Sequence, residues 1–416
     1  MKHDRVEDHC KNGVRMNDRY NVTTDRRYHA PHGGSADTPD SGNHHLSVRK
    51  LGRVRPGWSA IFAALCLLMV GGTPPATAQS YSFTDLGTIG GTGGGAYGIS
   101  DNGQVAGWSS TTGNAAVHAT LWNNGAITDL GVLGGNTSSI AYGVNNAGQV
   151  VGRSIGSGGY LATLWRGGAI SDLGFGNNSS ASAINRSGQV VGIMSGQATT
   201  WTSGSITNNF QTNFLQPSIN DRGQIVGESG NKAVLWDSGV TTVLGALTGS
   251  VNSYAYAINS TGQIVGDSIF CGACNDRATL WDRNGSVINL GTLGGADSIA
   301  LDINDLGQIV GNSTLSGGDY HATLWNAGVL LDLNSFLDAS NVAAGWVLTQ
   351  ATAINDSGWI VGSAFNTTTK TSSAFLLASV SPIPEPETYA MLLAGLGLMG
   401  WVVRRRKGRK GEGAVS

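Results

Sequence analysis

A nine-residue phrase recurs along the middle of the chain and limits its possible folds more than any other feature. The clearest copy runs from Ile303 to Gly311 and reads Ile-Asn-Asp-Leu-Gly-Gln-Ile-Val-Gly. Equivalent glycines are separated by roughly 35 to 51 residues, and a repeat of this size marks a solenoid, a propeller or a similar array. The other copies begin at Ile99, Val144, Ile184, Ile219, Ile258 and Ile354.

Each repeat unit contains three further segments ahead of this phrase. They read Ala-Thr-Leu-Trp, Ile-x-Asp-Leu-Gly and Leu-Gly-Gly, and the first of them is intact at 119–122, 162–165, 278–281 and 322–325. Asn124-Gly125 and Gly167-Gly168 separate short apolar or β-branched runs, which indicates hairpin turns because these residues accept positive φ. No ten-residue helical stripe occurs in the repeats. We therefore expect about four short strands in each unit.

The repeat region, residues 79–380, begins and ends within a unit. Its first segment, Tyr81 to Gly87, matches Ile-x-Asp-Leu-Gly, and its last, Ser373 to Leu377, stands in the place of Ala-Thr-Leu-Trp. This offset predicts an all-β, seven-bladed β-propeller of four-stranded units, closed by pairing of the N- and C-terminal strands. Closure removes long exposed sheet edges. An open solenoid, the alternative, would show atypical polar caps.

Composition agrees with a turn-rich β protein and excludes some partners. Glycine contributes 63 of the 416 residues and charged residues only 12%, which does not fit a disordered chain. Residues 79–380 hold 8 Lys and Arg against 17 Asp and Glu, a net charge of −9. An acidic surface of this kind disfavours nucleic acid as a partner.

The segments before the repeats predict export. Residues 1–48 are polar and without period, and we expect a disordered segment or an extension upstream of the true start. Residues 49–78 have the pattern of a secretory signal peptide, with a basic start, an apolar stretch at 58–70 and the small-residue site Ala76-Thr77-Ala78. Signal peptidase would cleave between Ala78 and Gln79.

Two cysteines, Cys271 and Cys274, remain after that cleavage. An oxidising compartment favours a disulfide across this short loop, although such a small loop gains little entropic stabilisation. A metal site would need more ligands than the nearby Asp267 and Asp276. A redox Cys-x-x-Cys would need a βαβ context, which the repeats do not offer. We therefore expect a local disulfide, with no metal and no cofactor.

Two residue types recur at fixed places in the units. The tryptophans are expected in the core between blades, where a large ring buries much area, and a sugar-binding platform is the alternative. The aspartates are expected to cap turns, and calcium binding is the alternative. The tryptophans are Trp122, Trp165, Trp201, Trp236, Trp281 and Trp325, and the aspartates are Asp85, Asp129, Asp172 and Asp332.

The C-terminal tail, residues 381–416, has a different composition. Pro384-Glu385-Pro386 precedes an apolar run at 388–403, which ends at the basic residues Arg404, Arg405, Arg406 and Lys407. A run of this length is short for a membrane span, and the basic cluster should stay on the cytoplasmic side.

These residues closely resemble the PEP-CTERM sorting signal of Gram-negative bacteria. The resemblance implies transient insertion of a short transmembrane helix in the inner membrane and cleavage near Pro384-Glu385-Pro386 by an exosortase. It further implies location at the cell surface or outside the cell, often alongside exopolysaccharide.

The units between 81 and 377 look like HAF extracellular repeats. The Asp-Leu-Gly-x-Leu-Gly-Gly and Ile-Asn-x-x-Gly-Gln-x-Val-Gly segments match well, while the His-Ala-Phe phrase becomes His118-Ala119-Thr120 and His321-Ala322-Thr323. This resemblance implies an extracellular repeat protein and no particular activity.

No catalytic motif accompanies the repeats. Neither Gly-x-Ser-x-Gly nor His-Glu-x-x-His occurs, and His118 and His321 are the only histidines between 79 and 380. We therefore expect a non-enzymatic scaffold that binds an extracellular polysaccharide or a protein. A ligand-free spacer is one alternative. A polysaccharide lyase or glycosidase is the other, with paired carboxylates drawn from Asp221, Glu228, Asp267, Asp302, Asp305 and Asp319.

Overall fold

The computed structural model describes residues 80–209, 215–271 and 275–380. The predicted segments 1–48, 49–78 and 381–416 lie outside these residues. So do the predicted cleavage site at Ala78 and Gln79, Cys274, Pro384-Glu385-Pro386 and the basic residues 404–407. The described part of the chain consists almost entirely of short antiparallel strands.

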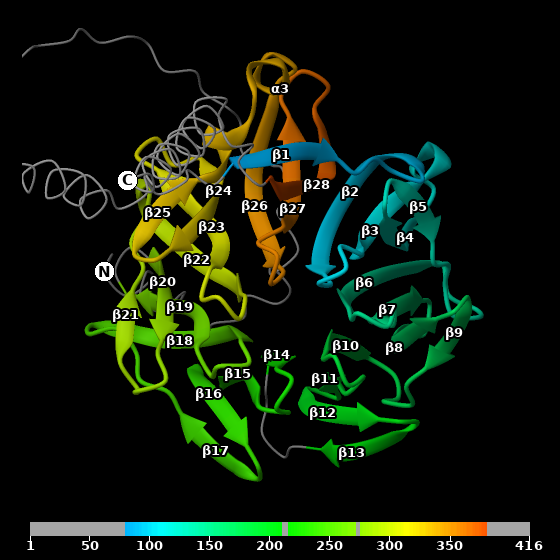
Figure 1. The fold of residues 1–416 in the computed structure, drawn as a ribbon. Coiled ribbons are helices and arrows are strands. Elements are labelled where there is room, and N and C mark those ends of the chain that lie inside the picture. Colours follow the sequence, from blue (N-terminus) through cyan, green and yellow to red (C-terminus); the bar gives the residue numbers. More distant parts are fainter. Residues whose placement is uncertain (1–79, 210–214, 272–274, 381–416) are drawn as a thin grey trace, which may run out of the picture. The chain divides into compact units, whose positions relative to one another are not determined.

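Five sheets each contain four consecutive antiparallel strands (Figure 1). They are β6–β9 (Ser138–Val144, Val150–Gly156, Gly159–Arg166, Ala169–Asp172), β10–β13 (Ser179–Ile184, Val190–Met194, Gln197–Thr202, Ser205–Asn209), β14–β17 (Leu215–Ile219, Ile225–Ser229, Lys232–Asp237, Val240–Val243), β18–β21 (Ser250–Ile258, Ile264–Phe270, Asn275–Trp281, Val287–Asn289) and β22–β25 (Gly294–Ile303, Ile309–Leu315, Tyr320–Asn326, Val329–Asp332).

The remaining strands form one eight-stranded sheet from both ends of the repeat region. Its two four-stranded groups meet at a single parallel bridge, between Gly93 and Ser372. One group contains β26 (Trp346–Ile354), β27 (Ile360–Asn366), β28 (Thr371–Val380) and β1 (Ser80–Asp85), and the other contains β2 (Gly90–Ile99), β3 (Val105–Thr111), β4 (Val117–Asn123) and β5 (Ala126–Asp129).

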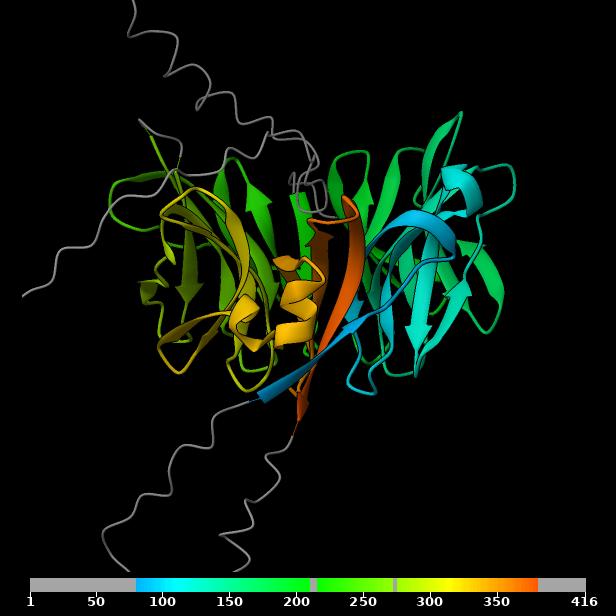
Figure 2. The same ribbon diagram turned by 90° about the horizontal axis from the view of Figure 1, so that it is seen from above.

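The predicted pairing of the first and last strands is confirmed. β1 runs antiparallel to β28 with Phe83 opposite Leu377 and Asp85 opposite Phe375. Figure 2 shows the two strands side by side where the chain ends of the repeat region meet. Leu86 continues the contact, because its N–H donates to the carbonyl of Ala374 at 2.9 Å.

Among the described residues, three short helical segments interrupt the strands: η1 (Thr112–Asn114), η2 (Leu333–Phe336) and α3 (Ala339–Ala343). The last two lie in the unit with the longest repeat spacing, between β25 and β26. Asp338 caps α3, since its side chain accepts the N–H of Asn341 at 2.8 Å. The repeat pattern did not predict these segments, because a single turn of helix has no measurable periodicity.

The asparagine of the repeated phrase explains why the turn between the first two strands of a sheet forms. The side-chain oxygen of Asn145 accepts the N–H groups of Ala147 and Gln149, both at 3.1 Å. Its Nδ2 donates to Oε1 of Gln149 at 2.9 Å and to the carbonyl of Asn185, in the next sheet, at 3.2 Å. One side chain thus closes its own turn and connects two sheets.

This connection passes from each sheet to the next and returns to the start. The donors are Asn145, Asn185, Asn220, Asn259, Asn304 and Asn355, and the carbonyl that accepts from Asn355 belongs to Ser100, in the turn between β2 and β3. Ser100 has no side-chain amide, so it donates no bond equivalent to those of the asparagines. Instead, the N–H of Asp101 donates to Oδ1 of Asn146 at 2.8 Å and completes the circuit.

Two glycines of the phrase are required for different steric reasons. Gly148 has φ +70°, a left-handed conformation that glycine adopts without strain. Gly152 lies opposite a bulge in β6, and a Cβ there would be 2.0 Å from the carbonyl oxygen of Ile140. No side chain fits at that distance.

The core lies between neighbouring sheets. Trp165 packs against Ala106 and Ala119 of the preceding sheet, and Trp122 packs against Val361 and Ala374. The predicted role of the tryptophan column in the core between sheets is confirmed for Trp122, Trp165, Trp281 and Trp325, whose exposure is 2–4%. Trp201 and Trp236 are only half-buried.

Candidate functional site

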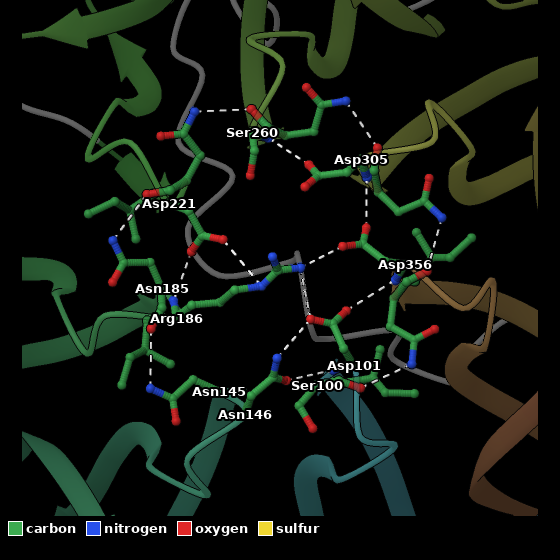
Figure 3. Close-up of a pocket in the computed structure, with 18 of the residues that line it drawn as sticks. Ser100, Asp101, Asn145, Asn146, Asn185, Arg186, Asp221, Ser260, Asp305 and Asp356 are labelled. Carbon is green, nitrogen blue, oxygen red and sulfur yellow. Dashed lines mark hydrogen bonds and ion pairs between the residues drawn. The ribbon is translucent and has the colours of Figure 1, made fainter.

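A cavity of about 200 Å³ lies where seven turns of the repeated phrase meet. Each turn contributes its first three residues, so the lining follows directly from the repeat (Figure 3). The third residue differs from turn to turn and determines the chemistry of the cavity. In chain order these third residues are Asp101, Asn146, Arg186, Asp221, Ser260, Asp305 and Asp356.

The third residues are joined from sheet to sheet. One carboxylate oxygen of each aspartate accepts the backbone N–H of the third residue in the preceding turn. For example, Asp356 Oδ1 accepts from Asp305 at 2.9 Å, and Asp101 Oδ1 accepts from Asp356 at 3.2 Å. In each aspartate, one carboxylate oxygen therefore accepts a backbone N–H, and the other faces the cavity.

Arg186 lies among these second oxygens. Its Nη2 is 2.9 Å from Asp101 Oδ2 and 2.5 Å from Asp356 Oδ2, and its Nε is 3.3 Å from Asp221 Oδ2. These partners belong to three different strand groups, so one guanidinium connects turns that are far apart in the sequence. The Arg186 side chain keeps 51% of its exposure, and the carboxylates keep about a third of theirs.

The charges perturb one another. Burial raises the pKa of Asp101, but hydrogen bonds from Asn146 and the Asp356 N–H, together with the Arg186 charge, outweigh it and hold that pKa below its usual value. Burial lowers the pKa of Arg186, and the carboxylates of Asp101, Asp221 and Asp356 reverse this and raise it. The arginine therefore stays charged, and Asp101 stays ionised.

Only two of the six acids proposed from the sequence lie in this cavity, Asp221 and Asp305. Glu228 is buried, and its carboxylate accepts the N–H of Asn231. Burial raises the pKa of Glu228, and this hydrogen bond offsets part of the effect.

The other three acids lie elsewhere. Asp267 is buried with its Oδ2 3.4 Å from the Tyr256 hydroxyl. Asp302 accepts the N–H of Ile354 at 2.9 Å, and Asp319 is exposed in the turn between β23 and β24.

Asp101, Arg186 and Asp356 were missed by the sequence reasoning. Each stands directly after the Asn or Ser of the phrase, so a signal existed in its position. What the sequence did not reveal was that this position of every turn faces one shared cavity. A variable position directly after the nearly constant asparagine is the feature that could have identified them.

The two histidines within the described residues pair with recurring aspartates at the outer side of their sheets. His118 Nδ1 is 2.8 Å from Asp129 Oδ2, and His321 Nδ1 is 2.7 Å from Asp332 Oδ2. These carboxylates also cap turns, since Asp129 Oδ1 accepts the Gly131 N–H at 2.8 Å. The predicted capping role of the aspartates is confirmed, and Asp85, Asp172 and Asp332 make the same kind of bond.

The other predicted site residues add little chemistry to the described structure. Cys271 is exposed, and its predicted disulfide partner Cys274 lies outside the described residues, so the disulfide stays a prediction. Within residues 80–209, 215–271 and 275–380, no group of three or more His, Cys, Asp or Glu side chains is arranged to hold a metal ion. No helix among these residues is long and apolar enough to cross a membrane.

Comparison with known protein families gives a match in the C-terminal tail. Residues 382–407 match the PEP-CTERM protein-sorting motif, which implies export to the cell surface and processing by an exosortase. This match contains the predicted Pro384-Glu385-Pro386 and the four basic residues 404–407. No curated protein matches the chain.

Solved structures with some likeness are distant. An extracellular domain of a one-component system from B. thetaiotaomicron has 10% identity and a TM-score of 0.48, covering 73% of this chain. The chain spans only 40% of the length of that structure. The PQQ-bound aldose sugar dehydrogenase from Streptomyces coelicolor has 11% identity and a TM-score of 0.36, covering 74% of this chain and 100% of its own. The chain is thus similar to these structures only weakly, and it carries a PEP-CTERM sorting motif at its C-terminal end.

Proposed function

We propose that this chain is an exported, exosortase-processed cell-surface or extracellular-matrix protein, a seven-bladed β-propeller that acts as a non-enzymatic binding scaffold. The main support for export is the PEP-CTERM motif at residues 382–407. The signal-peptide pattern at 49–78 and the similarity of the units to HAF extracellular repeats support the same location. The partner is an extracellular polysaccharide or a protein of the same compartment.

The circuit of strands and turns supports the propeller. β1 completes the group of β26, β27 and β28, which gives four strands to that group as to the others. The hydrogen bonds from turn to turn return from Asn355 to Ser100. These groupings of the described strands support the proposed count of seven four-stranded blades.

The contacts in the central cavity support a non-enzymatic role. General acid–base catalysis needs a group that can exchange its proton near the working pH. Asp101 is held ionised with a lowered pKa, and Arg186 occupies the second oxygens of Asp101, Asp221 and Asp356. These groups stabilise one another, which suits a structural connection across the ring.

A panel experiment tests the binding function. The purified exported protein would be incubated with extracellular polysaccharides and with proteins secreted by the same cells, and binding and the release of cleavage products would be measured in parallel. Saturable binding without cleavage is the expected result. Absence of binding to any of them would favour the ligand-free spacer.

A polysaccharide lyase or glycosidase remains the second candidate, favoured by the presence of Asp101, Asp221, Asp305 and Asp356 in one cavity. Asp221→Asn keeps an oxygen that can accept the Arg186 N–H and removes the carboxylate charge. Suppose that the protein cleaves a polysaccharide and that this variant loses the activity while keeping its melting temperature. The enzymatic function would then be preferred to the non-enzymatic scaffold.

The sorting signal has its own test. Replacing Arg404, Arg405, Arg406 and Lys407 with neutral polar residues removes the basic stop of the tail. We expect an unprocessed or mislocalised precursor, detected by its larger mass in fractionated cells. Normal maturation of this variant would count against exosortase sorting.

A further inference from the structure

Two of the seven third residues in the central cavity, Ser260 and Asp305, lie outside the contacts of Arg186 (Figure 3). The arginine pairs with the aspartates of three other turns, and neither of these two residues is among its partners. The backbone N–H of Ser260 donates to Asp305 Oδ1 at 2.7 Å, which fixes the two turns beside each other. One side of the cavity therefore consists of groups that the arginine does not hold.

Three polar groups on this side of the cavity make no hydrogen bond to a described residue. Asp305 accepts the Ser260 N–H through Oδ1, which leaves Oδ2, and the Ser260 hydroxyl is likewise left. Arg186 donates to its partners through Nε and Nη2, which leaves Nη1. Figure 3 shows this nitrogen on the side of the guanidinium that faces Ser260 and Asp305. An acceptor, a donor and a hydroxyl thus face the same space.

The lining of this cavity is complete within the described residues. Each of seven turns supplies three lining residues, from 99–101 in the first turn to 354–356 in the last. The cavity has a volume of about 200 Å³, below the roughly 300–1,000 Å³ of pockets for drug-sized ligands, so it suits one small unit. Because the turns lie all around it, a polymer can enter only by its end (Figure 3).

The charges in the cavity favour a neutral ligand. Its third residues include four aspartates and one arginine, so an anionic group would be repelled. A cationic group would be attracted to Asp305 Oδ2, but it would also lie against the Nη1 side of the Arg186 guanidinium, which has the same charge. A neutral ligand with several hydroxyls avoids both repulsions.

Neighbouring hydroxyls of a sugar match the three groups. Each hydroxyl can both donate and accept a hydrogen bond, whereas a carboxylate only accepts and a guanidinium only donates. One sugar hydroxyl can therefore donate to Asp305 Oδ2 while the next accepts from Arg186 Nη1. Hydrogen bonds to charged partners of this kind are stronger than those between neutral groups.

We propose that the side of the central cavity formed by Arg186, Ser260 and Asp305 binds the terminal unit of a neutral polysaccharide. This site rests on the proposed scaffold function and deepens it, because it names the class of ligand and the residues that bind it. Asp305 and Arg186 bind two neighbouring hydroxyls of the sugar, and the Ser260 hydroxyl binds a third polar group of the same unit.

The main variant for the test is Asp305→Asn. Its side-chain oxygen can still accept the Ser260 N–H, but an NH2 donor replaces the acceptor Oδ2 at the cavity. Asp319→Asn is the matched control, because Asp319 is an exposed turn residue of the same sheet and the change in charge is identical. Ser260→Ala is a second variant, which removes the hydroxyl and keeps the backbone N–H that binds Asp305.

The purified exported protein and these variants would be titrated calorimetrically with maltohexaose, cellohexaose and mannohexaose. A glucosamine hexamer and an alginate hexamer represent cationic and anionic chains. The disaccharide of any neutral hexamer that binds would be titrated as well, and melting temperatures would be recorded for all proteins.

We expect wild type and Asp319→Asn to bind a neutral hexamer alike. Asp305→Asn should bind it at least about tenfold more weakly, a loss of about 1.4 kcal/mol, and Ser260→Ala about threefold more weakly, with melting temperatures unchanged. The disaccharide should bind about as tightly as the hexamer, because only the terminal unit enters the cavity.

Equal binding by wild type and Asp305→Asn would overturn this site and leave the scaffold function standing. Binding of the glucosamine or alginate hexamer alone would overturn the assignment to a neutral sugar. A hexamer that binds far more tightly than its disaccharide would contradict recognition of the chain end. Absence of saccharide binding by wild type would overturn both this site and the polysaccharide form of the proposed function.

Discussion

The position after the asparagine of the repeated phrase (a serine in the first copy) holds four different residue types in seven turns, whereas the glycine two residues later is the same in all of them. The turn itself needs only the asparagine side chain and the glycine, so this position is free to vary. Arg186 is the one cation among the seven third residues of the cavity, and it contacts Asp101, Asp221 and Asp356. A single residue therefore balances a concentration of negative charge that the repeat creates.

Arg186→Gln should destabilise the protein, because it leaves the carboxylates of Asp101, Asp221 and Asp356 close together without a counter-charge. Since these groups are partly exposed, we expect a loss of only about 1–2 kcal/mol, or a few degrees in melting temperature. Thermal unfolding measured at low and high salt provides the check. The difference from wild type should shrink in about 1 M salt, because salt screens the repulsion.

The difference in melting temperature between wild type and Arg186→Gln should also depend on pH. The pKa of Asp101 is lower in the folded protein than its ordinary value of 3.8. Its stabilising contribution is therefore complete above that value and is lost as the pH falls through the folded-state pKa. The melting temperatures of wild type and Arg186→Gln should differ near neutral pH and converge in acid. A constant difference from pH 7 to pH 2 would exclude the charge network as its cause.

At the scale of the strand, the last glycine of the phrase is required by the bulge opposite it. The inner strand shifts register between Ala141 and Gly143, and this brings the Ile140 carbonyl onto the place where a Cβ of residue 152 would stand. Gly192, Gly266, Gly311 and Gly362 have equivalent contacts of 1.9–2.2 Å. The repeated glycine is thus a packing requirement between two strands.

Gly152→Ala should be severely destabilising, by more than about 3 kcal/mol, because backbone atoms cannot move aside without disrupting the pairing of β6 and β7. Gly158→Ala is the matched control in the same sheet, since a Cβ there meets nothing within 4 Å. Chemical denaturation of both variants measures the contrast. Similar midpoints for the two would show that the bulge adapts easily.

At the scale of the whole repeat region, the two ends of the chain complete one group of strands. β1 pairs with residues 375–380 of β28, and Tyr81 is buried in the same core cluster as Phe375 and Leu377. Without β1, the edge of β28 would be exposed, and Tyr81 and Phe83 would leave that core. The two ends of the repeat region therefore share one core and one group of strands.

Deleting residues 80–85 should lower the melting temperature strongly and favour aggregation, because an unpaired edge strand invites pairing with another chain. Calorimetry and light scattering on the purified proteins are the measurements. A double variant, Tyr81→Ala with Phe83→Ala, keeps the strand and removes the side chains, so it separates the core contribution from the edge. Unchanged melting of the deletion would contradict closure by β1.

The repeated phrase, its period and its offset at the two ends were enough to predict an all-β chain of four-stranded units whose first and last strands pair. Those features are local: turn chemistry, strand alternation and buried tryptophans follow from residue type and spacing. The central cavity could not be predicted, because it depends on which positions of separate units face each other. Only the tertiary structure brings Arg186 to Asp101 and Asp356, since residues far apart in the chain meet when the sheets close around one centre.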